Sequence, residues 1–303
     1  MKQRAATLLL VMALSAGACG KNGSGADTTP PAVPRGVLAT ATGTLVKVFW
    51  LGNNDPDFSH YLLYAGTRSD SLVDLGEELV QTSRFFDGLT PGTTHYYAVS
   101  AVDETGNESD LSSTVSAVPT SPAHSTSRGW AAFTAGEYTD AFQHFQIALN
   151  LDGNYAEAFH GRGWTHLIRD DLSNARVQLL TAISKGLTTV DVYAGLAILY
   201  RELPDLQTAI GHALTVVTGD PDWEFSHLTS IDYRDMHLLM AQCYFRQGED
   251  WFDEAQGQVD ILDPSNGLDP ADTGTWIVGG ITYGTYGAAL MTAIMELEAV
   301  IGG

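Results

Sequence analysis

From residue 128 to about residue 222, the chain repeats one pattern of apolar and polar positions every 34 residues. Ala141, Ala175 and Ala209 follow one another at this step, and the tripeptide Arg-Gly-Trp at 128–130 returns at 162–164. A 34-residue period is typical of helix-turn-helix units that stack, because no single unit can bury its apolar face alone. The pattern therefore predicts an all-α helical-repeat solenoid.

Each unit resembles a tetratricopeptide repeat. In the first unit the family pattern is carried by Gly136, Tyr138, Ala141, Phe145 and Ala148. Small residues stand at the positions where paired helices approach each other most closely. We expect repeats over 128–268, with three regular units to about residue 222, an interruption at 223–234 and a fourth, irregular helix pair. A capping segment and helix follow over 269–303.

Residues 30–120 show a different pattern, in which short runs of alternating apolar and polar residues are separated by Gly, Pro, Asn and Asp. Val46, Val48 and Trp50 alternate with other residues, and Tyr97 and Val99 do the same later in this region. Period-two alternation predicts half-buried β-strands, and several such runs predict a sandwich.

Three stretches of this region resemble a fibronectin type III module: Thr-Pro-Pro-Ala-Val-Pro at 29–34, Val-Phe-Trp at 48–50, and Leu-Thr-Pro-Gly-Thr at 89–93 leading to Val-Ser-Ala-Val-Asp at 99–103. The stretch Asp-Glu-Thr-Gly-Asn-Glu-Ser at 103–109 completes the bacterial form of the motif. The resemblance implies an all-β immunoglobulin-like sandwich over 30–120, and we expect it to act as a spacer. A short linker at 121–127 then leads to the all-α region. The predicted fold class is thus two-domain, a sandwich followed by a solenoid.

The N-terminus has the pattern of an export signal. Lys2 and Arg4 precede an apolar run over 5–14, and small residues stand directly before Cys19. We expect a signal peptide over 1–18 and a flexible tether over 19–29. The cleavage region resembles the lipobox of bacterial lipoproteins, which implies lipid attachment at Cys19; the alternative is ordinary signal cleavage. No aspartate follows the cysteine, which in that family favours the outer membrane.

The net charge excludes one class of partner, and the remaining cysteine and the charge-free stretch each have a structural interpretation. The chain carries a formal net charge of −21, and such a surface repels phosphate backbones, so we expect no nucleic-acid partner. Cys243 lies in an apolar stretch and is expected to be a buried, inert side chain. Residues 274–295 carry no charge, but their weak hydrophobicity favours a capping helix over a membrane span.

The sequence offers little for an enzyme. It contains no HExxH pair, GxSxG elbow or phosphate-binding glycine loop, and we expect no catalytic residues, no cofactor, no metal and no small-molecule substrate. Loop oxygens could ligate calcium, although loop acids are usually only solvated. The residues concerned are Asp55, Asp57, Asp103, Glu104, Asn107 and Asp110.

The resemblance to tetratricopeptide repeats implies a concave groove lined by the first helix of each unit. The predicted partner-binding residues are Trp130, Phe133, Glu157, His160, Trp164, Leu167, Ile198 and Arg201. Two interpretations of the tryptophans stay open. They are either aromatic anchors for a partner, or they pack between domains or against neighbouring helices.

We therefore expect an exported, lipid-anchored, non-enzymatic envelope protein that binds a protein or peptide partner in this groove, as a scaffold or assembly factor. The alternative is an adhesive or glycan-binding surface protein that uses the sandwich. In that case Trp50, Tyr61 and Tyr97 would stack on sugar, although their strand alternation favours the core.

Overall fold

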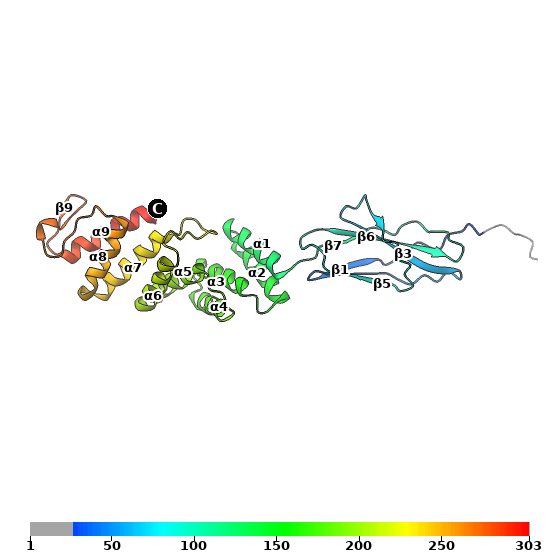
Figure 1. Cartoon of the computed structure of the whole chain (residues 1–303), viewed down its shortest axis with the longest axis horizontal. Coiled ribbons are helices and arrows are strands. Elements are labelled where there is room, and N and C mark those ends of the chain that lie inside the picture. Colours follow the sequence, from blue (N-terminus) through cyan, green and yellow to red (C-terminus); the bar gives the residue numbers. More distant parts are fainter. Residues whose placement is uncertain (1–26, 303) are drawn as a thin grey trace, which may run out of the picture. The chain divides into compact units, whose positions relative to one another are not determined.

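A computed structural model describes residues 27–302. The predicted signal peptide, Cys19 and most of the predicted tether lie outside the described residues. The chain divides into two compact units, and we describe a strand-rich N-terminal region and a helical C-terminal region separately. Figure 1 labels their elements.

The N-terminal region contains two sheets, as the alternating runs predict. One has the strand order β1-β2-β5 and the other β4-β3-β6-β7. The strands are β1 (Leu38–Thr42), β2 (Leu45–Phe49), β3 (Phe58–Gly66), β4 (Val73–Asp74), β5 (Ser83–Phe86), β6 (His95–Asp103) and β7 (Val115–Ala117). The alternating apolar side chains Val46, Val48, Leu63 and Val99 are fully buried. This confirms the all-β sandwich class.

Strand β6 departs from the prediction because both of its faces are buried. On the second face, side chains of β6 and β3 form hydrogen bonds with Glu108, which lies over them. Ser100 donates its hydroxyl to Glu108 at 2.6 Å, and Tyr64 on β3 donates to the same carboxylate at 2.7 Å. Glu108 thus bridges the two central strands, and alternation alone does not predict such a cover.

The helical region begins with paired antiparallel helices. They are α1 (Pro122–Thr134), α2 (Tyr138–Leu151), α3 (Ala156–Ile168), α4 (Leu172–Ser184), α5 (Val190–Glu202), α6 (Leu206–Gly219), α7 (Tyr233–Gln247) and α8 (Phe252–Leu262). Each odd-numbered helix packs on the even-numbered helix that follows, and α1, α3, α5 and α7 pack on one another in order. This arrangement confirms the helical-repeat class.

The first helix starts earlier than expected, since residues 122–127 were predicted as linker. The Ser121 hydroxyl accepts a hydrogen bond from the His124 amide, and Pro122 occupies the first helical turn. Proline is tolerated there because its missing N–H has no partner in an ideal helix either. The predicted linker is therefore mostly helical.

The repeated Arg-Gly-Trp tripeptide has a packing cause. A Cβ added to Gly129 would lie 2.6 Å from the Phe145 ring, and one added to Gly163 would lie 2.6 Å from Leu179. Phe145 and Leu179 are themselves 34 residues apart and fully buried. Glycine therefore recurs because the second helix of each pair presses a large side chain onto the first.

The end of the chain is less regular. Two 3-10 turns, η1 (Glu249–Trp251) and η2 (Thr273–Thr275), and a hairpin of β8 (Ile277–Val278) and β9 (Ile281–Thr282) precede the last helix, α9 (Tyr286–Ile301). Helix α9 packs on α7 and α8 and contributes to a second apolar core. No helix within residues 27–302 combines the length and the apolar content needed to cross a membrane.

Candidate functional site

The inner layer of the helical region, formed by α1, α3, α5, α7 and α9, holds the eight residues predicted to bind a partner. Each helix of this layer contacts the next. Six of the residues lie on α1 and α3, and Ile198 and Arg201 lie on α5. The sequence thus placed them on one layer, but their exposure differs sharply between its two ends.

Trp130 on α1 is almost completely buried within a cluster of rings. Its indole N–H donates to Glu157 on α3 at 2.9 Å, and the imidazole of His227 stacks on it with ring centres 4.0 Å apart. Phe133, also on α1, is 1% exposed and meets Trp130 edge to face at 5.5 Å. Both side chains belong to the core.

Trp164 on α3, the equivalent residue of the second repeat, has no exposed surface. Its indole N–H donates to His160 Nε2 at 3.0 Å and to the backbone carbonyl of Asp191 on α5 at 3.2 Å. Its ring stacks on Phe225 with centres 4.1 Å apart. Packing against neighbouring helices, one of the two interpretations left open by the sequence, therefore describes both tryptophans.

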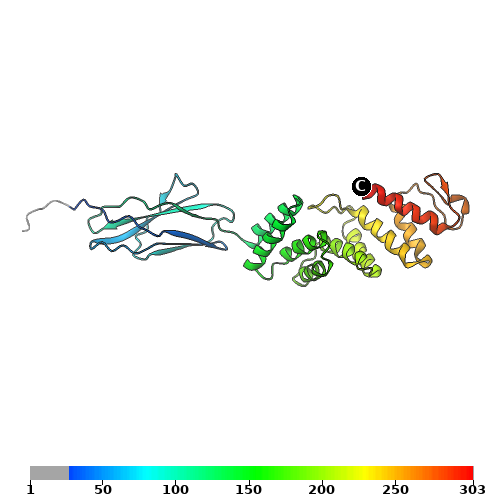
Figure 2. The same ribbon diagram turned by 180° about the vertical axis from the view of Figure 1, so that it is seen from behind.

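The residues that cover these tryptophans come from the interruption of the repeat between α6 and α7. Trp223 and Phe225 of this segment are 2% and 0% exposed. Thr134 on α1 donates its hydroxyl to the carbonyl of His227 at 3.2 Å. In Figures 1 and 2 the segment extends from α6 back towards α1. The segment thus covers the two tryptophans, while a cavity of about 620 Å³ lined in part by Thr126, Glu157 and His227 lies beside α1 and α3.

The side chains of Glu157 and His160 lie beside this segment and contact each other. The Glu157 carboxylate accepts from Trp130, and His160 Nδ1 lies 3.4 Å from it. Burial alone would raise the pKa of Glu157, but the contacts with His160 and Trp130 outweigh it and lower that pKa. His160 is buried and Leu167 nearly so. His160 and Leu167 thus belong to the repeat core, whereas the Glu157 side chain is 34% exposed.

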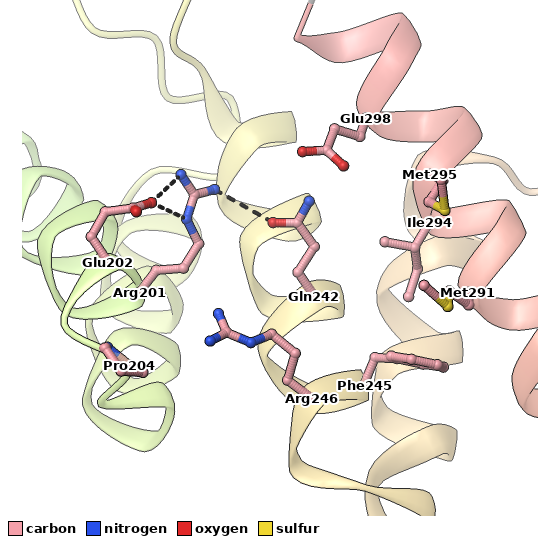
Figure 3. Close-up of a pocket in the computed structure, with 10 residues that line it drawn as sticks. All are labelled: Arg201, Glu202, Pro204, Gln242, Phe245, Arg246, Met291, Ile294, Met295 and Glu298. Carbon is pink, nitrogen blue, oxygen red and sulfur yellow. Dashed lines mark hydrogen bonds and ion pairs between the residues drawn. The ribbon is translucent and has the colours of Figure 1, made fainter.

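The opposite end of the inner layer is open. A cavity of about 550 Å³ lies among α5, α7 and α9 (Figure 3). Its apolar side is formed by Met291, Ile294 and Met295 of α9 with Phe245 of α7, and the two methionines are 50% and 56% exposed. Arg201 is the one predicted binding residue that lines it. The other lining residues are Glu202, Pro204, Gln242, Arg246 and Glu298.

Two arginines face this cavity in an otherwise acidic chain. Arg201 pairs with Glu202 at 3.0 Å and donates to Gln242 at 3.4 Å. Arg246 is exposed, and it has no ion pair or hydrogen bond within residues 27–302. Cys243 lies on the same helix but is fully buried, and burial raises the pKa of its thiol to about 11. As expected from the sequence, this cysteine is an inert core residue.

The sandwich brings three acids together. Carboxylate oxygens of Asp27, Asp57 and Asp103 lie within 4.8 Å of one another, and the latter two were among the possible calcium ligands. Asp103 is already hydrogen-bonded to Thr105 and Asn107. Burial favours a higher pKa for Asp103, but these bonds outweigh it and lower the pKa to about 2. Because the buried acid is satisfied by its own loop, we assign no metal here.

The three aromatic residues considered for sugar stacking lie in the sandwich core. Trp50, Tyr61 and Tyr97 are 4%, 1% and 1% exposed. The rings of Trp50 and Tyr61 meet edge to face with centres 5.4 Å apart. These side chains therefore present no ring to a sugar.

The sequence pattern did not predict two parts of the inner layer, the segment after α6 and the cavity beside α9. The segment after α6 appeared only as an interruption, although its apolar residues Trp223, Phe225, Leu228 and Ile231 signal burial. The cavity was missed because α9 lies outside the repeat register. The last helix does carry an apolar stripe that includes Ile294, but such a stripe by itself predicts only packing against neighbouring helices.

Comparisons with known proteins give partial matches. No protein-family model matches the chain. It is 30% identical over 155 residues to an amylopullulanase from Thermoanaerobacterium saccharolyticum and 32% identical over 99 residues to one from Thermoanaerobacterium thermosulfurigenes. These matches cover 51% and 32% of the chain, but only 11% and 5% of the enzymes. The matched stretches are small parts of long proteins.

Solved structures match the two regions separately. An Fn3-like protein from Clostridium thermocellum covers 29% of the chain and 92% of its own length, at 26% identity and a TM-score of 0.27. YrrB, described as a TPR protein with an unusual peptide-binding site, covers 58% of the chain and 85% of its own length, at 16% identity and a TM-score of 0.43. MamA covers 45% of the chain and 68% of its own length, at 20% identity and a TM-score of 0.37.

Proposed function

We propose that this chain is a non-enzymatic, lipid-anchored envelope protein that binds a protein or peptide segment in the cavity among α5, α7 and α9. A scaffold or assembly role would follow from such binding. The observation that carries the proposal is the exposed, mixed lining of this cavity, which contrasts with the burial of Trp130 and Trp164 in the first two repeats.

The apolar side of the cavity suits a peptide side chain. Met291 and Met295 leave about half of their surfaces in solvent, one helical turn apart on α9. Methionine is flexible and polarisable, and it recurs at surfaces that adapt to different partners. An apolar side chain placed between these residues and Phe245 would remove apolar surface from water, at roughly 25 cal/mol per Å².

The polar side of the cavity suits an acidic group beside that side chain. Arg246 is exposed without an ionic partner in the described part of the chain, whereas Arg201 already donates to Glu202 and Gln242. Arginine binds carboxylates through paired N–H donors. Because the whole chain carries a charge of −21 and Glu202 and Glu298 also line the cavity, attraction of an acidic group depends on the exposed Arg246.

The test is recovery of partners by the full chain from envelope extract, compared among variants. Arg246→Glu and Met295→Glu reverse or interrupt the cavity lining at exposed positions. Matched controls are Arg176→Glu and Val177→Glu, which change exposed residues of α4 outside the cavity. We expect the same partner to be lost, at least about tenfold, in both cavity variants and in neither control.

Equal recovery by all four variants would refute binding at this cavity. Loss in all four would instead indicate a general charge effect. Circular dichroism of each variant is the folding control, because exposed substitutions of this kind normally change stability by at most about 0.5 kcal/mol.

The lipid anchor is a separate part of the proposal. It rests on the signal-like pattern of residues 1–18 and on Cys19, which both lie outside the described residues. Labelling with a fatty-acid probe should be lost in Cys19→Ala, and that variant should leave the membrane fraction. Label that persists in Cys19→Ala would rule out this cysteine as the site. An adhesive or glycan-binding role for the sandwich stays an alternative prediction.

A further inference from the structure

The segment between α6 and α7 presents alternate side chains of residues 223–227 to the inner face, before a turn in which the Leu228 amide donates to the Phe225 carbonyl at 2.9 Å. Trp223, Phe225 and His227 point into the repeats, whereas the intervening Glu224 and Ser226 are exposed. Alternation of this kind is how an extended peptide presents every second side chain to the surface that binds it. It is the pattern of a ligand more than that of an ordinary helix connection.

The three inward residues meet three successive repeats. The Trp223 indole N–H donates to the Asp191 carboxylate on α5 at 2.7 Å. Phe225 stacks on Trp164 of α3 at 4.1 Å, with an angle of 19° between the rings. The segment therefore runs along the inner layer from the third repeat towards the first.

The first repeat receives the end of this stretch. The His227 ring lies 4.0 Å from Trp130 of α1, with an angle of 3° between the ring planes, and its carbonyl accepts from Thr134. The residues that meet the segment thus include both tryptophans of the repeated Arg-Gly-Trp tripeptide. These contacts explain why tryptophan stands at positions 130 and 164, because packing between paired helices does not by itself require an aromatic residue there.

The segment is also folded against itself. The amide of Phe225 donates to the Ile231 carbonyl at 2.9 Å, and that of Tyr233 donates to the Trp223 carbonyl at 2.7 Å. Its removal from the groove would expose Trp164 and Phe225, which are both fully buried. Aromatic side chains of this size each bury about 150–250 Å², so spontaneous opening is strongly disfavoured.

We propose that the inner face of the first three repeats is a binding site for a Trp-x-Phe-x-His peptide, and that residues 221–232 of the chain occupy it as a permanent internal ligand. This inference does not depend on a partner at the cavity among α5, α7 and α9. Its consequence is that external peptides are excluded from the aromatic site that the segment occupies, because a tethered ligand competes at an effective concentration of millimolar order.

The experiment uses a full-length variant in which residues 222–231 are replaced by a Gly/Ser linker, with Asp232 kept because it caps α7. The probe is a fluorescent synthetic peptide of residues 221–232. We expect the variant to bind this peptide with micromolar affinity by fluorescence anisotropy, and the unmodified chain to bind it at least about tenfold more weakly. A peptide carrying Trp223→Ala and Phe225→Ala is the matched control and should not bind.

Equal binding to both chains, or equal binding of the control peptide, would overturn the inference. If the variant does not fold alone, it is refolded with and without the peptide. The native-sequence peptide should then restore cooperative unfolding, and a failure to do so equally overturns the proposed recognition.

Permanence is tested on the unmodified chain by hydrogen exchange. The amides of Phe225 and Tyr233 should exchange as slowly as those in the middle of α3 and α5, at least about a hundredfold more slowly than unprotected amides. Exchange of this segment at the rate of an open loop would contradict a permanent ligand. None of these outcomes depends on whether the cavity variants lose a partner.

Discussion

The two ends of the inner helical layer are built on one scaffold but present opposite surfaces. At the first three repeats, rings of Trp130 and Trp164 are covered by the chain's own residues, with Phe225 fully buried between them. At α7 and α9 the side chains of Met295 and Arg246 are open to solvent beside a cavity of about 550 Å³. Repeat geometry provides an inner layer, and the residues outside the repeat register decide whether it is filled.

The largest expected effect compares one apolar side chain from each end. Phe225→Ala should reduce the free energy of unfolding of the helical region by about 3–5 kcal/mol, because it leaves a cavity against Trp164. Met295→Ala should change it by at most about 0.5 kcal/mol, because that residue is 56% exposed. Urea unfolding followed by circular dichroism measures both. Similar losses in the two variants would erase the distinction between a filled end and an open end.

A second comparison concerns the close helix packing of the regular repeats. Gly163→Ala should destabilise the helical region by about 1–3 kcal/mol, because the new Cβ would lie 2.6 Å from Leu179. Gly211→Ala on α6 is the matched control, since no atom lies within 4 Å of its added Cβ. That variant should be stabilised by about 0.5–1 kcal/mol through helix propensity. Stabilisation by both substitutions would show that the tripeptide glycine is not needed for packing.

A third comparison tests the polar anchor of the internal segment. Asp191→Ala removes the acceptor of the Trp223 indole N–H and should cost about 1–3 kcal/mol, because a buried donor is left unsatisfied. Asp191→Asn keeps a side-chain oxygen and should cost less than the alanine variant. Both are measured by urea unfolding together with the emission of the tryptophans. Equal costs for the two substitutions would mean that the hydrogen bond contributes nothing specific.

The smallest effect is a pH dependence at the filled end. Burial lowers the pKa of His227, and its electrostatic interaction with His160 acts in the same direction, while Asp191 and Glu157 oppose it. A lowered pKa means that the unfolded chain binds more protons than the folded chain below about pH 6.5. Stability is therefore complete above that value and decreases as the pH falls towards the folded-state pKa of His227.

His227→Phe keeps a ring on Trp130 but removes this titration. The variant should show a shallower loss of stability between pH 7 and pH 5 than the unmodified chain, measured by urea unfolding at each pH. Glu157 acts in a lower window, because its pKa is also lowered and its contribution is lost only below about pH 4.3. An unchanged slope between pH 7 and pH 5 in His227→Phe would exclude this histidine as the source.

Which residues lie on the inner layer followed from the sequence, but their accessibility did not. The 34-residue step placed Trp130 and Trp164 at equivalent positions, and both do lie on the first helices of their repeats. Their burial depends on Phe225 and His227, which are separated from them by about 60 to 100 residues and lie outside the period. A contact of such long range leaves no periodic trace in the sequence.

The sequence by itself determined the two fold classes, the alternating sandwich core and the register of the three regular repeats. It could do so because these depend on local periodicities of 2, 3.6 and 34 residues. Only the tertiary structure decided that residues 221–232 fill one end of the inner layer and that α9 opens a cavity at the other. Both outcomes depend on how segments outside the repeat fold back, which is governed by side-chain packing between elements distant along the chain.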